Sequence, residues 1–190
     1  MIEQASSIFA LEITGQDHIQ GPENAEVTLV EYGDFECPHC AAAFPIVEKL
    51  RHQQGENLRF VYRHFPLSES HPNAQNAAEA AEAAGAKDLF WPMHQLLFEN
   101  QTALTIPDLV GYADQLGVDA GWFKETLVKH LFAKRVREDF IGGVRSGVNG
   151  TPTFFINGIR HDGSASFAAL TNAVSEQVNS TAKKPRKAGS

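Results

Sequence analysis

The sequence has no long apolar run and no excess of positive charge, and it contains only two cysteines. No stretch approaches the roughly 18 consecutive apolar residues that a membrane helix requires, so we expect no membrane insertion. The formal net charge of -7 argues against binding to nucleic acid, whose phosphates favour basic surfaces. Two cysteines cannot form the disulfide framework of a small secreted scaffold.

The N-terminus, MIEQASSIFALEI, lacks the basic start and apolar core of a secretory signal. We therefore expect a cytoplasmic protein as the sequence is written, and a periplasmic or otherwise extracytoplasmic one if a signal peptide was removed. Positive charge is concentrated at the other end, in the run Lys183, Lys184, Pro185, Arg186 and Lys187. We expect this run to belong to a solvated, disordered tail over residues 181–190.

The 190 residues, 43% of them hydrophobic and 21% charged, are enough for one globular domain with a substantial core. Val27 to Tyr32 is a short, mostly apolar and β-branched segment between turn residues, which predicts a buried strand. A helix is predicted from Pro38 to Gln54, with a kink because Pro45 lies inside it. A second strand over Leu58 to Phe65 completes a strand, helix, strand unit, which predicts a parallel pair.

The middle of the chain shows helical spacing and almost no strand signal. The predicted helices cover Asn73–Ala84, Phe90–Glu99, Thr105–Leu116, Ala120–His130 and Phe132–Arg145. A tight hairpin then follows, with strands over Thr153–Ile156 and Ile159–His161, and a helix over Ser166–Val178 ends the pattern. We therefore predict an α/β fold with an N-terminal extension (1–17), a core formed by 18–66 and 150–180, and an inserted helical subdomain (67–149).

Both cysteines lie where the first predicted helix begins, in the order Cys37-Pro38-His39-Cys40. Unpaired N–H groups and the dipole at a helix start favour negative charge, so a thiolate at Cys37 is stabilised. Cys40, one turn later, can attack a mixed disulfide formed at Cys37 and release the partner. The pair can therefore cycle between dithiol and disulfide.

The two cysteines allow two other interpretations. They could be small buried hydrophobes with no chemistry. They could also bind zinc together with His39, but structural zinc normally needs a second ligand pair, and no other cysteine exists. Among the remaining histidines, we expect His94 to be a satisfied core residue and His130 to lie at the surface.

Several motifs together resemble the DsbA-like branch of the thioredoxin superfamily. They are the Cys37–Cys40 motif after an apolar strand, the stretches RHFPL (63–67), HPNA (71–74) and FWPMHQLLF (90–98), and Gly150-Thr151-Pro152-Thr153 before a hairpin. The resemblance runs from about residue 18 to 178 and implies a thioredoxin fold with a helical insertion. It also implies a thiol-disulfide oxidoreductase that uses no metal and no organic cofactor.

The resemblance assigns roles to individual residues. It makes Cys37 the nucleophile and Cys40 the resolving cysteine, with His39 helping to hold the thiolate. Glu31 falls where the family keeps a buried acid that could take the proton from Cys40 through water, although its side chain could instead point to solvent. Pro38 is assigned to the substrate-binding surface.

The loop Thr151-Pro152 matches the one whose proline is cis and packs against the cysteine pair, with the backbone of Thr151 pairing to an extended substrate. The expected partners are proteins with thiols or disulfides, with glutathione as a further candidate, and the expected state is a monomer. The acidic residues Asp34 and Glu36 depart from the most oxidising relatives, because nearby negative charge raises the pKa of a thiol. We therefore expect an intermediate oxidising strength.

Two alternatives stay open at this point. A glutathione-dependent transferase or isomerase can use the same fold, but such relatives usually carry a serine or a single cysteine at the active position. A redox-sensing or binding module could use the disulfide only to switch an interface, and catalytic turnover would separate it from an enzyme.

Overall fold

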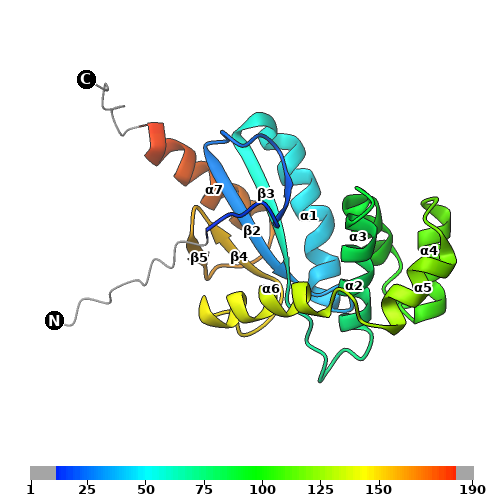
Figure 1. Cartoon of the computed structure of the whole chain (residues 1–190). Helices are drawn as coiled ribbons and strands as arrows, with labels where there is room; N and C mark the ends of the chain where they lie inside the picture. The colour runs from blue at the N-terminus through cyan, green and yellow to red at the C-terminus, as the bar shows by residue number, and fades with distance from the viewer. Residues whose placement is uncertain (1–11, 183–190) are drawn as a thin grey trace.

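The computed structural model describes residues 12–182 as five strands in one sheet, with seven α-helices around it (Figure 1). The strands lie in the order β1-β3-β2-β4-β5. The bounds of the strands are β1 His18–Gln20, β2 Val27–Gly33, β3 Leu58–His64, β4 Thr153–Ile156 and β5 Ile159–His161. Strands β2 and β3 are parallel, as predicted, and the other neighbouring strands are antiparallel.

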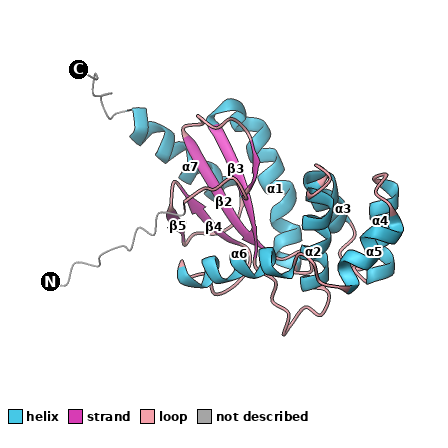
Figure 2. Cartoon of the chain, viewed as in Figure 1, coloured by secondary structure: helices cyan, strands magenta, loops and turns pink. Residues whose placement is uncertain are grey.

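The helices fall into two groups by their place in the chain, and both groups can be followed in Figure 2. Helices α1 (Pro38–Gln54) and α7 (Phe167–Ala182) pack against each other and against strands of the sheet. The others form a continuous insertion between β3 and β4: α2 Ala74–Gly85, α3 Phe90–Glu99, α4 Ile106–Gln115, α5 Ala120–Val128 and α6 Ala133–Arg145. The prediction of an α/β thioredoxin fold with a helical insertion is confirmed.

Alternation along the central strands divides the core into two layers. Leu29 of β2 and Tyr62 of β3 belong to the larger layer, which includes both cysteines, α1, α7 and the alanine-rich α2. Val30, Tyr32 and Val61 belong to the smaller layer on the other face, where Phe140 of α6 covers them. Successive strand residues point to opposite faces, so α1 and α6 lie on opposite sides of the sheet.

Several boundaries differ from the sequence prediction. Strand β1 was not predicted, because three residues are too few to show an alternating pattern. Helix α5 ends at Val128 rather than at His130, whose backbone φ of +50° is left-handed and cannot continue a helix. Helix α1 is continuous through Pro45, and the predicted kink there stays a prediction.

At the C-terminus, helix α7 extends to Ala182, so the predicted tail does not begin at residue 181. The basic run at 183–187 lies outside the described residues. None of the helices that the structure describes is long and apolar enough to cross a membrane.

Candidate active site

The Cys37–Cys40 motif lies at the start of α1, which follows the carboxyl end of the central strand β2. Cys37 is the N-cap residue, with extended backbone angles, and Pro38 occupies the first helical turn. The carbonyl of Cys37 accepts hydrogen bonds from the backbone N–H groups of Cys40 and Ala41, at 3.0 and 3.1 Å. Both cysteines are free thiols.

Cys37 is enclosed although it lies at a helix start, and only 3% of it is exposed. The reason is a loop that is distant in the sequence: Cys37 Sγ lies 3.5 Å from the carbonyl oxygen of Thr151. Cys40 is fully buried one turn deeper, so Cys37 still is the more accessible of the two.

The two thiols have opposite electrostatic environments. A hydrogen bond from Cys40 is the main reason why the pKa of Cys37 is lowered to about 5, and the backbone N–H groups of Cys40 and His39 add to it against the cost of burial. Burial raises the pKa of Cys40 well above its usual value, and its hydrogen bond to Cys37 and the charge of Glu31 raise it further. At neutral pH the site therefore holds a Cys37 thiolate beside a Cys40 thiol.

The acidic residues Asp34 and Glu36 are hydrogen-bonded to other parts of the chain. Asp34 accepts hydrogen bonds from the backbone N–H groups of Glu36 and Leu67, at 2.8 and 2.9 Å, and lies 2.7 Å from His71 Nδ1. Glu36 accepts from the backbone and side-chain amide groups of Asn73, at 2.6 and 2.8 Å. Both carboxylates are tied to the start of the helical insertion. The expectation that they raise the pKa of Cys37 stays a prediction.

Glu31 lies in β2 and is 3% exposed, so its side chain does not point to solvent. It pairs in register with Tyr62 of β3 and Phe154 of β4. Burial, followed by the negative charge of Cys37, raises the pKa of Glu31 to about 8. Its Oε1 atom has no hydrogen-bond partner in the described chain. A buried carboxyl group with a pKa near neutrality can exchange a proton with the thiol above it.

The predicted loop also reaches the cysteines. The Thr151–Pro152 peptide bond is cis, and Thr151 is the residue that Cys37 contacts. A cavity of about 350 Å³ opens beside it, and its walls include His39, Thr151, Pro152, Arg160 and His161. The side chain of Arg160 donates to the carbonyl of Gly147 and to Asn149, just before this loop. The structure thus brings Cys37, His39, Thr151 and Pro152 together at one surface.

Sequence reasoning missed Gln101, which follows α3 in the helical insertion. Its side-chain amide donates to the carbonyls of Phe35 and Cys37, at 2.7 and 2.9 Å. A single glutamine in a turn carries no periodic signal, so only the three-dimensional arrangement identifies it.

His39 is exposed, and the group through which it lowers the pKa of Cys37 is its backbone N–H.

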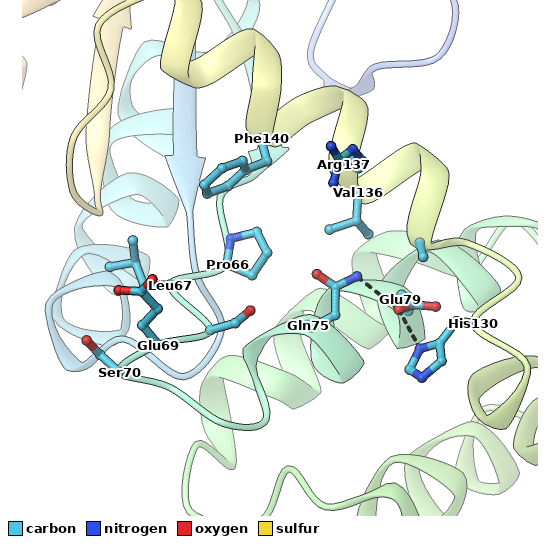
Figure 3. A pocket seen from close by; sticks show the side chains of 12 residues that line it. Pro66, Leu67, Glu69, Ser70, Gln75, Glu79, His130, Val136, Arg137 and Phe140 are labelled. Atoms are coloured by element: carbon cyan, nitrogen blue, oxygen red, sulfur yellow. Dashed lines mark hydrogen bonds and ion pairs between the residues drawn. The ribbon is translucent and has the colours of Figure 1, made fainter.

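A larger cavity, of about 700 Å³, lies away from the cysteine pair, between the loop after β3, α2 and α6 (Figure 3). Glu79 there accepts from Gln75 Nε2 and lies 2.9 Å from His130 Nδ1. None of the residues that line it belongs to the Cys37–Cys40 motif or to the loop at Thr151, so we do not place the chemistry there.

One group of side chains has a composition that can bind a metal ion: His18, His64 and Glu82. The Nε2 atoms of both histidines lie 2.8 and 2.9 Å from Glu82 Oε1, and Arg135 Nε lies 3.9 Å from the same oxygen. These hydrogen bonds account for the arrangement, and the guanidinium group places positive charge where a cation would bind. We assign the group a structural role, because it joins β1 and β3 to helices α2 and α6.

Three comparisons with known proteins agree with this geometry. Residues 13–176 match the Thioredoxin_4 family, described as thioredoxin. The Na(+)/H(+) antiporter NhaA 1 of Salinispora arenicola is 50% identical over 171 residues, which are 90% of this chain and 26% of that protein. The NhaA antiporter of Herminiimonas arsenicoxydans is 44% identical over 155 residues, 82% of this chain and 24% of that protein. The chain thus spans about a quarter of the length of these curated relatives.

Solved structures show the same fold. Oxidised BdbD from Bacillus subtilis superposes with a TM-score of 0.79 and 24% identity, covering 86% of this chain and 94% of BdbD. For alpha-DsbA1 of Wolbachia pipientis the TM-score is 0.78 at 17% identity, with 93% and 98% of the two chains covered. The protein therefore belongs to the thioredoxin family, with the DsbA-like arrangement of a thioredoxin core, an inserted set of helices and a Cys-x-x-Cys pair.

Proposed function

We propose that this protein is a thiol-disulfide oxidoreductase that exchanges electrons with protein disulfides through Cys37 and Cys40. The observation that carries the proposal is the opposite shift of two neighbouring thiols, with the pKa of Cys37 lowered to about 5 and that of Cys40 raised. Such a pair supplies a nucleophile at neutral pH and a second thiol in reserve. The match to a thioredoxin family supports it independently.

The reaction is a pair of disulfide exchanges. The Cys37 thiolate attacks one sulfur of the substrate disulfide, a mixed disulfide forms, and the other substrate sulfur leaves as a thiolate and takes up a proton. Cys40 then gives its proton to Glu31, directly or through water, and attacks Cys37 Sγ. The bond between Cys37 and the substrate breaks, so the substrate is reduced to two thiols and the enzyme is oxidised. The reverse sequence oxidises a dithiol substrate.

The loop at Thr151 is the proposed docking edge. An extended substrate segment can pair with the backbone of Thr151 while its sulfur reaches Cys37, which the Thr151 carbonyl contacts at 3.5 Å. Pro38 and Pro152 flank this position, and the cavity of about 350 Å³ beside His39 accepts the neighbouring substrate side chain. Glutathione is a second candidate partner, because it presents a thiol in an extended peptide.

A trapping experiment tests the proposal. In a Cys40→Ser variant, mixed disulfides with an oxidised substrate protein should accumulate on Cys37, because no thiol resolves them. A Cys37→Ser variant is the matched control and should trap nothing. Trapping that survives the loss of Cys37, or wild-type protein that never turns over a protein disulfide, would overturn the assignment and favour a redox-sensing module. The intact Cys40 already speaks against a glutathione transferase.

We also propose a partner class. Over 90% of its length this chain is 50% identical to a segment that makes up 26% of a Na(+)/H(+) antiporter. In this proposal the substrate thiols or disulfides belong to a Na(+)/H(+) antiporter. The Cys40→Ser variant, mixed with membranes that contain such an antiporter, should form a mixed disulfide with it. If the trap captures soluble disulfide proteins but never the antiporter, the partner is wrong while the oxidoreductase proposal stands.

A further inference from the structure

Tyr62 is a buried phenol next to the proposed proton acceptor. It lies in β3, is completely buried, and is the register partner of Glu31 on the parallel neighbour β2. Partners of this kind point to the same face of a sheet, and Tyr62 belongs to the core layer that contains Cys37 and Cys40. Its side chain and that of Glu31 therefore share the space beneath α1.

The hydroxyl group of Tyr62 has no hydrogen-bond partner in the described chain, and the same is true of Glu31 Oε1. A buried hydroxyl without a partner is destabilising, so most buried hydroxyl groups in native proteins are hydrogen-bonded. Here two such atoms belong to residues that are direct neighbours across the sheet. One is a donor and the other an acceptor.

Gly33 shows where the phenol runs. A methyl group at Gly33 would lie 2.7 Å from the Tyr62 hydroxyl oxygen and 2.6 Å from its ring. The ring therefore extends along β2 towards the end of the strand that leads to the active-site loop, and only glycine leaves room for it. Phe35 stacks on the ring with 5.2 Å between centroids, and His94 meets it edge-on at 4.7 Å. These contacts fix the position of the hydroxyl group.

Tyr32 provides an internal contrast. It lies on β2, one residue beyond Glu31, and is equally buried, but it faces the layer covered by α6. Its hydroxyl group accepts a hydrogen bond from Arg63 Nη1 at 3.1 Å. The hydroxyl group of Tyr32 is thus hydrogen-bonded within the protein. The hydroxyl group of Tyr62, the neighbour of Glu31 across the sheet, has no hydrogen-bond partner in the described chain.

We propose that Tyr62 is a positioning residue of the resolving step: its hydroxyl group donates a hydrogen bond, through one bridging water, to the ionised carboxylate of Glu31. The inference rests on the proposed function. Cys40 gives its proton to Glu31, the new bond between Cys40 and Cys37 forms, and the electron pair of the broken bond leaves with the substrate sulfur. Tyr62 keeps its own proton throughout and stabilises the carboxylate before the transfer.

The electrostatics of the pocket agree with a donor role. Burial, then the negative charges of Cys40 and Glu31, raise the pKa of Tyr62 well above its usual value, so the phenol stays protonated. The titratable groups around it are His18, Glu31, Asp34, Cys40, His64 and His94, and the charge of Asp139 on α6 also raises its pKa. Burial lowers the pKa of His94 well below its usual value, so that ring is neutral.

The first test is the pH dependence of resolution in a Tyr62→Phe variant. A mixed disulfide is preformed at Cys37, and its release by Cys40 is followed in a single turnover. Because a hydrogen bond to a charged group contributes about 1.5 kcal/mol or more, the acidic limb of the rate profile should move up by about one pH unit. The release rate at pH 7 should then fall about tenfold. The rate at which Cys37 attacks a substrate disulfide should not change.

A Tyr32→Phe variant is the matched control and should leave the profile in place, although it loses a hydrogen bond. The second test combines Tyr62→Phe with Glu31→Gln. If Tyr62 acts through Glu31, the double variant should resolve at the rate of Glu31→Gln alone. If the two substitutions instead lower the release rate by independent factors that multiply in the double variant, the inference is overturned. It is also overturned if the pH profile of the release rate does not shift in Tyr62→Phe.

A further variant covers the case in which Tyr62→Phe does not fold. Incorporating 3-fluorotyrosine at position 62 keeps the ring and makes the phenol a stronger hydrogen-bond donor. The acidic limb of the rate profile should therefore move to lower pH. A limb that stays in place would contradict the proposal. If the wild-type protein turns over disulfides and all position-62 variants have the same release rates and pH profile, only this inference is overturned. Wild-type protein without turnover would sink the proposed function.

Discussion

Cys37 and Cys40 are separated by two residues, yet their environments favour opposite protonation states. The sequence indicates half of this contrast, because a helix start stabilises a thiolate on general grounds. The other half comes from Cys40 itself, whose hydrogen bond is the largest cause of the lowered pKa of Cys37. The resolving cysteine therefore also activates the nucleophile.

This dependence predicts how Cys37 responds to changes at position 40. In Cys40→Ala the donor is lost, and the apparent pKa of Cys37, about 5 in the wild type, should rise by about one unit or more. Cys40→Ser keeps a hydroxyl donor and should give a smaller rise. The measurement is the pH dependence of alkylation of Cys37 by iodoacetamide. Equal midpoints in the two variants would show that the helix start alone sets the pKa.

Glu31 predicts a stability effect with a defined pH dependence. Its folded pKa of about 8 lies above the ordinary carboxyl value of roughly 4.3, so ionising it in the folded protein costs stability as the pH rises through this window. Glu31→Gln should therefore leave the free energy of unfolding unchanged near pH 4 and increase it progressively up to about pH 8. Turnover should fall, because the proton acceptor is lost. Chemical denaturation at several pH values checks the first part, and a stability gain that is constant with pH would contradict it.

At the scale of elements, the parts that the sequence predicts best are those with strong local signals. The VTLVEY strand, the capping box of Thr105 and Asp108 before α4, and the Asn157-Gly158 hairpin all carry their own local pattern. The contacts that complete the site have no such pattern. Asn73 binds Glu36 and Gln101 binds the carbonyl of Cys37, across 37 and 64 positions of sequence. Such pairs depend on how the insertion packs against the core, which a single sequence does not reveal.

Gln101 gives a prediction for the connection between the insertion and the active-site loop. Gln101→Ala removes the side-chain donor to the carbonyl of Phe35 and one of the three donors to the carbonyl of Cys37, so we expect a loss of about 1 to 3 kcal/mol in the free energy of unfolding. We also expect slower attack by Cys37, because its loop is held less firmly. The matched control is Gln95→Ala, which loses only an exposed hydrogen bond to Glu99. Equal losses in the two variants would mean that the contact of Gln101 does not matter.

At the scale of the whole molecule, the lowered pKa of Cys37 links redox state to stability. The thiolate exists only in the reduced protein, and its folded pKa of about 5 is below the roughly 8.5 of an unfolded thiol. The reduced form should therefore gain stability that is complete above about pH 8.5, declines as the pH falls, and is lost near pH 5. Thermal unfolding of the reduced and oxidised proteins across this range measures the difference. A variant with both cysteines replaced by alanine should show no such window under reducing conditions.

The same linkage bears on the redox potential, for which the acidic residues Asp34 and Glu36 predict an intermediate value and the lowered pKa of Cys37 a more oxidising one. Whatever stabilises the Cys37 thiolate favours the dithiol form, so the protein should be a stronger oxidant than the sequence indicated. The carboxylate of Glu36 is held by the two amide groups of Asn73, so we expect that it does not oppose this effect. Glu36→Gln should therefore leave the potential, measured by equilibration with glutathione, unchanged. A more oxidising Glu36→Gln variant would show that this charge reaches Cys37 despite its hydrogen bonds.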